Sequence, residues 1–199
     1  MATPASVVTL IDADLRRSFG ARLHHLYADM DQAYRQVSAA CGFICHGCDD
    51  NCCWSRFHHH TIVEYLDLQS GLASLTPNER EQISTRAVEA VKAPAQQRPP
   101  CPLLEDGRCR LYRHRPMICR LHGLPHRTER PDGTVLQGDG CPAFHARCGP
   151  ARLRLDRTPF YRRMAALETQ LRAEIGFSAR VKLTVAEMIV AMGPEVDEP

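Results

Sequence analysis

The sequence has no long apolar run. Asp, Glu, Arg or His interrupts every hydrophobic stretch, so none approaches the roughly 20 apolar residues that a transmembrane helix needs. Residues 1–10 also lack the basic region, the apolar core and the small-residue cleavage site that together mark a secretory signal. We therefore expect a cytoplasmic protein that has no membrane partner.

Lysine is scarce, and the common nucleotide and hydrolase motifs are missing. Lys92 and Lys182 are the only lysines, an arginine bias that we attribute to a GC-rich bacterial genome. The chain contains no G-x-G-x-x-G, G-x-x-x-x-G-K-[ST], H-E-x-x-H or G-x-S-x-G motif, so nucleotide binding, zinc proteolysis and serine hydrolysis have no basis in the sequence. The net charge of +2 is too even to require nucleic acid or an anionic membrane as partner. No enzymatic reaction can be assigned.

The apolar residues that are present have helical spacing. With 44% hydrophobic and 24% charged residues, the composition is that of a soluble folded protein. From Leu15 to Val37, apolar side chains recur every three or four residues, which predicts one long amphipathic helix. We expect a mainly α protein, a single helical domain over residues 1–199, in which two irregular cysteine-bearing loops form a metal site.

Capping residues divide the chain into segments. We expect an N-terminal helix within residues 10–40, a cysteine-cluster metal-binding region over 41–148, and C-terminal helices within 158–193. Capping boxes and first-turn prolines predict where several helices start; these residues are Thr76, Pro77 and Glu79, Thr158 and Pro159, and Thr184 and Glu187. We also predict a short helix over 61–68 and a small hairpin within 121–140.

Ten cysteines are the most informative feature of the chain. Structural disulfides are rare in a reducing compartment, so metal binding explains ten cysteines better than oxidised pairs do. A C-x2-C-x3-C-C run presents closely spaced sulfurs, and a second group is too widely spaced to form a site alone, so we expect the two to meet across the fold. The predicted ligands are Cys45, Cys48, Cys52, Cys53, Cys101, Cys109, Cys119 and Cys141. Cys41 and Cys148 are expected to be ordinary buried thiols.

These residues resemble a known family. The run from Cys45 to Cys53 is followed by further matching elements, namely Cys101-Pro102-Leu103-Leu104, Gly107-Arg108-Cys109, Tyr112, Arg115-Pro116 and Cys119-Arg120. This order is similar to that of the YkgJ-type cysteine-cluster proteins, also called the CxxCxxCC family and described as a zinc- or iron-chelating domain, although the spacer before the vicinal pair is three residues here. The resemblance implies metal binding by the matched cysteines. The family includes relatives similar to flagellin lysine N-methylase, in which an iron-sulfur cluster accompanies methyl transfer.

The identity of the metal stays open between two alternatives. A ligand set made only of thiolates suits both tetrahedral zinc and iron-sulfur clusters. Zinc ribbons usually separate two C-x2-C pairs by about 15–20 residues, and the chain has no second such pair. We therefore favour an iron-sulfur cluster that is redox-active or assists modification of a protein partner. The alternative is a structural zinc-binding module with an Arg-rich surface that binds a partner.

Basic and aromatic residues accompany the second cysteine group. Tyr112, Arg115 and Arg120 are predicted to lie around the thiolates, because cationic and hydrogen-bonding neighbours offset the negative charge of such a site. An exposed basic surface is the alternative interpretation. We do not expect a nucleic-acid partner, because few aromatic side chains lie between these arginines to stack on bases. Three consecutive histidines, residues 58–60, cannot share one helix face, so none is assigned as a ligand.

Overall fold

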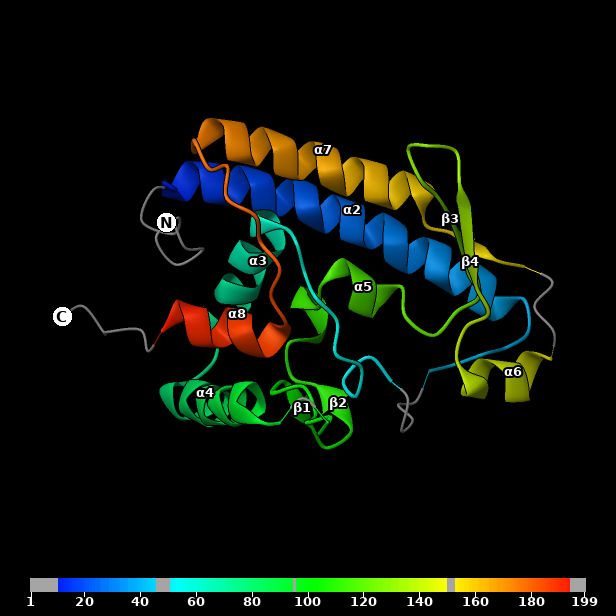
Figure 1. Cartoon of the computed structure of the whole chain (residues 1–199), viewed down its shortest axis with the longest axis horizontal. Coiled ribbons are helices and arrows are strands. Elements are labelled where there is room, and N and C mark those ends of the chain that lie inside the picture. Colours follow the sequence, from blue (N-terminus) through cyan, green and yellow to red (C-terminus); the bar gives the residue numbers. More distant parts are fainter. Residues whose placement is uncertain (1–10, 46–50, 95, 150–152, 194–199) are drawn as a thin grey trace.

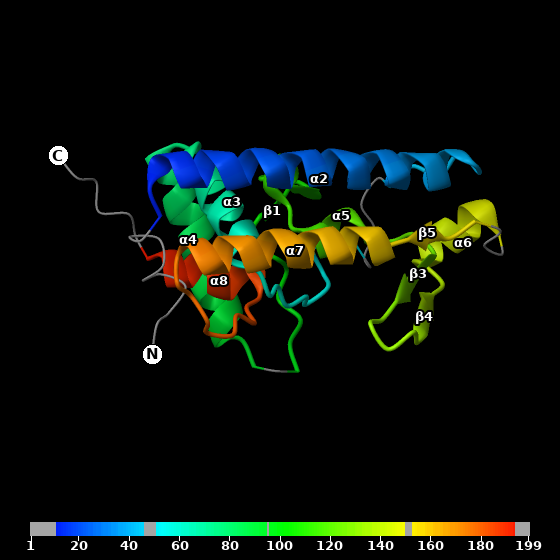
Figure 2. The ribbon, with the colours of Figure 1, turned by 90° about the horizontal axis from the view of Figure 1, so that it is seen from above.

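The computed structural model describes residues 11–45, 51–94, 96–149 and 153–193, and it is mainly α-helical, as the sequence predicts (Figure 1). Two long helices, α2 (Ala13–Ala39) and α7 (Thr158–Glu174), lie side by side and run in opposite directions (Figure 1, Figure 2). The described residues contain no helix with both the length and the apolar character that crossing a bilayer requires.

The stripe predicted for the first helix is buried. Asp12 caps α2 by accepting a hydrogen bond from the Leu15 backbone N–H at 2.7 Å. The apolar face of α2 packs against α7. The buried side chains of that face include Phe19, Leu23, Leu26 and Met30. Because burial of a large apolar side chain contributes about 1.5–3 kcal/mol, this contact is a major source of the stability of the fold.

Helix α3 (Ile62–Ala73) is buried on almost all sides, because it separates two hydrophobic clusters. Leu66 belongs to the cluster formed with α2 and α7, whereas Leu68 belongs to a second cluster formed with α4 (Pro77–Lys92) and α8 (Val185–Met192). A helix that is apolar around its circumference is typical of such a central position. The sequence predicts only residues 61–68 of this helix, which extends by about one more turn.

The predicted helix starts at the two capping boxes are confirmed. Thr76 and Glu79 form reciprocal bonds at the start of α4, and Thr184 and Glu187 do the same at the start of α8. Each box satisfies backbone N–H groups that the first turn of a helix leaves without intrahelical partners. The apolar faces that follow pack α4 and α8 against each other.

Two small sheets and three short helices lie between α4 and α7 in the sequence. The predicted hairpin is present as β3 (His126–Glu129) paired with β4 (Val135–Gly138), and β5 (Leu155–Asp156) adds to it in parallel with β3. A second hairpin pairs β1 (Leu104–Glu105) with β2 (Arg108–Cys109). The sequence analysis did not predict β1, β2 and β5, nor the short helices, which are η1 (Tyr112–His114), α5 (Met117–Arg120) and α6 (Pro142–Cys148).

The expectation that Cys41 and Cys148 are separate buried thiols is wrong. The structure joins them in a disulfide, and the two residues are 107 positions apart in sequence. Cys41 directly follows α2 and Cys148 ends α6, and the rings of Phe43 and Phe144 pack edge-to-face beside the pair. Only the contact between these two helix ends brings the sulfurs together, so no local pattern could have predicted the bond.

The N-terminus of α3 is capped by a side chain from α7. Thr61, the residue before the helix, makes no side-chain cap. The carboxylate of Glu168 instead accepts hydrogen bonds from the backbone N–H groups of Ile62 and Val63 at 2.9 and 3.1 Å, and it pairs with Arg172. Glu168 is only 7% exposed, so a buried carboxylate fixes the position of one helix relative to another.

Replacing Glu168 should destabilise the protein, because its carboxylate caps α3. Glu168→Ala leaves two buried N–H groups unpaired, and we expect the free energy of unfolding to fall by about 2–3 kcal/mol. Glu168→Gln should lose less, because the amide oxygen still accepts one bond. Urea unfolding measures the difference, with Thr169→Ala on the exposed side of the same helix as the control. Equal stability of Glu168→Ala and Thr169→Ala would show that the cap contributes nothing.

Candidate metal centre

The two cysteine-bearing segments meet, as the sequence predicts. The backbone N–H of Cys101 donates a hydrogen bond to the carbonyl oxygen of Cys53 at 2.7 Å. One pocket is lined by cysteines from both segments, and these are Cys52, Cys53, Cys101, Cys109 and Cys119. We call these residues the five-cysteine pocket. It brings together five of the eight predicted ligands from positions up to 67 residues apart.

The sulfur atoms inside the pocket interact with one another. A hydrogen bond with Cys119 is the main cause that lowers the pKa of Cys52, and a hydrogen bond with Cys53 adds to it. The hydrogen bond between Cys119 and Cys52 raises the pKa of Cys119. Cys53 also bonds Cys101, which raises the pKa of Cys53 and lowers that of Cys101. The pKa values of Cys119, Cys52, Cys53 and Cys101 therefore depend on one another.

Cys109 lines the same pocket. Burial is the main cause that raises the pKa of its thiol to about 12, and the negative charge at Cys101 adds to the effect. The β1–β2 hairpin places it there, because Leu104 pairs with Cys109 across the strands. Asp106 and Gly107 both have positive φ, 47° and 75°, which is the backbone geometry of the tightest two-residue hairpin turns.

Cys119 is positioned by a second buried carboxylate. It lies on α5, and the backbone N–H of Met117 at the start of that helix donates to Glu64 at 2.6 Å. Glu64 is 3% exposed and also accepts a bond from the Thr61 hydroxyl at 2.6 Å. Burial raises the pKa of Glu64 despite these bonds. Since Glu64 is on α3 and α3 is capped by Glu168, two buried glutamates connect α7 to the helix that carries Cys119.

The three residues predicted to lie around the thiolates have different surroundings. Arg120 is 5% exposed and is used by the protein scaffold, because it bonds Asp31 at 2.8 Å and the Arg115 carbonyl at 2.9 Å, and lies over the Tyr27 ring. Arg115 lines the five-cysteine pocket and also pairs with Asp31. Tyr112 is 58% exposed, with the Arg115 guanidinium 3.7 Å from its ring centre. Of the three, only Arg115 lines the pocket.

Two of the remaining predicted ligands, Cys45 and Cys141, lie outside the pocket. Cys45 is exposed and Cys141 is buried, and the charge of both helps to raise the pKa of Tyr34, for which burial is the main cause. Cys141 also caps α6, where its sulfur accepts a bond from the Phe144 N–H at 3.4 Å. Neither residue lines the five-cysteine pocket. Cys48 lies outside the described residues.

Sequence reasoning missed the side chains that hold the pocket in place. Glu64 and Glu168 act over 53 and 106 residues, and a single glutamate in a helix gives no local signal of such a role. The histidine run was left unassigned, and one of its members, His59, lies at the wall of the pocket. His60 instead bonds the Val181 carbonyl at 3.0 Å.

A known family matches the segment that contains the five-cysteine pocket. The family model named CxxCxxCC and described as "Putative zinc- or iron-chelating domain" matches residues 44–154, more than half of the 199-residue chain. The matched segment contains every cysteine predicted as a ligand and excludes α2, α7 and α8. Searches of the curated proteins and of the solved structures gave no match.

Acid should destabilise the protein through His59. Its side chain is buried, and burial, together with the charges of His60 and His58, lowers its pKa from 6.5 to about 4. Between these values the unfolded chain binds a proton that the folded protein excludes, so stability falls as the pH drops from 6.5 to 4. The size of the shift corresponds to about 3 kcal/mol. His59→Leu should lose this dependence, whereas His58→Gln, at an exposed position, should keep it.

Urea unfolding at pH 4, 5, 6 and 7 measures this difference. A chelator is present throughout, so that release of metal by acid does not contribute. The same pH dependence in His59→Leu and in the unmodified protein would contradict the assignment.

Proposed function

The chain belongs to the CxxCxxCC family of zinc- or iron-chelating domains, and on this premise we propose that the five-cysteine pocket holds an iron-sulfur cluster. The observation that carries the proposal is the convergence of Cys52, Cys53, Cys101, Cys109 and Cys119 on one pocket. Iron-sulfur clusters are held by cysteine thiolates, and four such ligands complete the usual set. The five thiols of the pocket are enough to supply that set.

The chemistry of the pocket fits such a group. Several of the thiols hydrogen-bond to one another, and part of the remaining wall is apolar, with Trp54, Phe57 and Pro116 among its residues. An apolar surrounding restricts the access of solvent and affects the reduction potential of a bound cluster. Arg115 supplies positive charge beside the thiolates. A bound cluster would supply one-electron redox chemistry, while the chain's own residues hold and shield it.

A structural zinc ion is the second candidate, and one specific observation favours it. Hydrogen bonds among Cys119, Cys52, Cys53 and Cys101 shift the pKa values of these four thiols, and four thiolates are the complete ligand set of a closed zinc site. In that case the metal contributes to folding, and function depends on a basic surface. Much of that basic charge is already paired, however, because Arg110 contacts Glu79 and Glu105 while Arg115 and Arg120 contact Asp31.

Purification without oxygen, followed by metal analysis and an absorption spectrum, separates the two candidates. An iron-sulfur cluster gives iron together with acid-labile sulfide and absorbs visible light. A colourless protein with stoichiometric zinc would support the second candidate and overturn the first.

Substitution of single cysteines tests which residues hold the metal. Cys119→Ser should lower the metal content, because it removes one of the thiols that line the pocket. Cys141→Ser should bind metal at the level of the unmodified protein, because serine keeps the cap on α6 and the residue lies outside the pocket. Metal content per chain measures both. Loss of metal from Cys141→Ser would show that the ligand set extends to the cysteines around Tyr34.

A further inference from the structure

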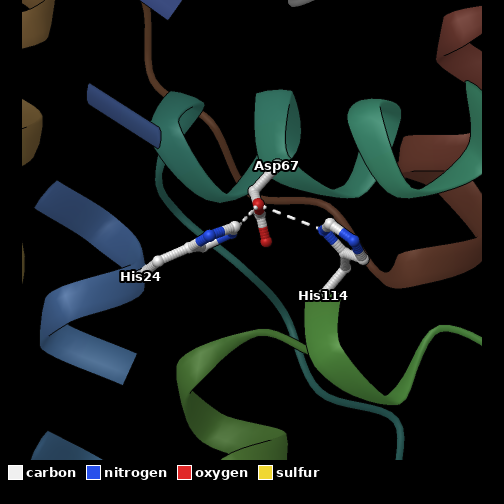
Figure 3. Close-up of side chains that lie close together, drawn as sticks. All are labelled: His24, Asp67 and His114. Atoms are coloured by element: carbon white, nitrogen blue, oxygen red, sulfur yellow. Dashed lines mark hydrogen bonds and ion pairs between the residues drawn. The ribbon is translucent and has the colours of Figure 1, made fainter. Parts of the chain in front are cut away.

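We propose that His24, Asp67 and His114 form a second metal site, free of cysteine, that binds a divalent first-row transition metal ion. The three side chains come from α2, α3 and η1, and Figure 3 shows the Asp67 carboxylate between the two imidazole rings. Oδ1 of Asp67 lies 2.6 Å from Nε2 of His24 and 3.1 Å from Nδ1 of His114. One ligand atom of each residue lies within 4.8 Å of those of the other two.

The donor set defines the class of ion. Two imidazole nitrogens and one carboxylate oxygen are the protein ligands of open zinc sites and of non-haem iron(II) sites. Calcium and magnesium prefer sites made of oxygen ligands alone, so they do not suit this arrangement. The site therefore differs in ligand chemistry from the five-cysteine pocket, and none of its three residues lines that pocket.

The buried carboxylate of Asp67 has an oxygen that is available to a cation. The side chain of Asp67 is 3% exposed, and its Oδ2 atom has no hydrogen-bond partner among the described residues. Buried charges in proteins are normally paired or bound to metal, because leaving one alone is costly. The contacts of Asp67 with His24 and His114 both use Oδ1. A metal ion bound by Asp67 and the two imidazoles would supply this carboxylate with a positive partner when both histidines are neutral.

Gly71 makes room for one of the ligands. It lies in the interior of α3, one turn after Asp67, where glycine costs about 1 kcal/mol relative to alanine. A Cβ atom at this position would lie 2.7 Å from Cγ of His114, closer than such contacts occur. The helix therefore accepts a poor helix former at the position where the imidazole of His114 packs against it.

The outer side of the site is accessible. The His24 side chain is 52% exposed and that of His114 is 23% exposed, in contrast to the buried Asp67. The ring of His24 stacks on Tyr27, whose centroid lies 6.3 Å away, so its orientation is supported although it faces solvent. Three protein ligands with one accessible side leave coordination positions for water or a small molecule, which is typical of exchangeable or catalytic sites rather than closed structural ones.

The experiment compares metal binding by variants of the full chain. Protein with its natural metal content is titrated with Zn²⁺ by calorimetry, and with Co²⁺ by absorption, which separates nitrogen and oxygen ligands from thiolates. The unmodified protein should bind one additional equivalent without a thiolate-to-cobalt band. His24→Ala should weaken that binding by at least about 100-fold, because a direct ligand matters more than the outer-shell groups whose loss costs 10–100-fold. The matched control is His25→Ala, the exposed neighbouring histidine, which should bind as the unmodified protein does.

A second variant perturbs the site from its other side. Gly71→Ala places a methyl group against the His114 ring and should also weaken the additional equivalent, while His24, Asp67 and His114 all remain present. Its fold is checked by circular dichroism and by an unchanged content of the natural metal. Absence of an additional equivalent in the unmodified protein, or equal affinity in His24→Ala and His25→Ala, would overturn the proposal and leave a metal-free hydrogen-bond network.

Discussion

Two buried glutamates hold together the helices to which the cysteine segments are attached. Glu168 on α7 caps α3, and Glu64 on α3 caps the short α5 that carries Cys119. Each carboxylate is almost fully buried, so its hydrogen bonds are strong and their loss leaves backbone donors unpaired. Metal ligands must be held in place by their surroundings if a site is to form with little rearrangement. Here helices α7 and α3 provide that support through two buried polar contacts.

The same scaffold brings two distinct sets of ligands onto neighbouring parts of the chain. Cys109 and Cys119 belong to the five-cysteine pocket, and His114 between them points instead toward Asp67 and His24. If both proposals hold, the segment from β2 to α5 contributes sulfur ligands to one site and a nitrogen ligand to the other. These ligand types favour different metals and different coordination. The model of the zinc- or iron-chelating family matches this segment. His24 lies on α2, outside the matched residues.

Much of the fold could be predicted from local sequence, and the contacts that build the site could not. The stripe on α2 and the capping boxes of α4 and α8 are encoded within a few residues, and the structure has them where they were expected. Helix α6 and strand β5 are short and carry no clear period. The Cys41–Cys148 bond joins helix ends that are distant in sequence, and such a pairing depends on tertiary contacts alone.

The cysteine pattern located the pocket but not its limits. Spacing and chemistry predicted that two segments meet, yet they could not separate the five residues of the pocket from Cys45 and Cys141 beside Tyr34. Asp67 is 43 residues from His24 and 47 residues from His114 along the chain, and no sequence motif connects the three. Burial decides the character of both sites, and burial is a property of the folded chain.

The most direct test of the central claim is to map which thiols the bound metal protects. The protein is treated with an alkylating reagent under native conditions before and after removal of metal by a chelator, and each cysteine is quantified by mass spectrometry. We predict that metal protects Cys52, Cys53, Cys101, Cys109 and Cys119 together, and that Cys45, which is exposed, reacts in both states. The account would be contradicted if the five pocket cysteines reacted equally with and without metal. It would also be contradicted if metal protected cysteines from only one of the two segments.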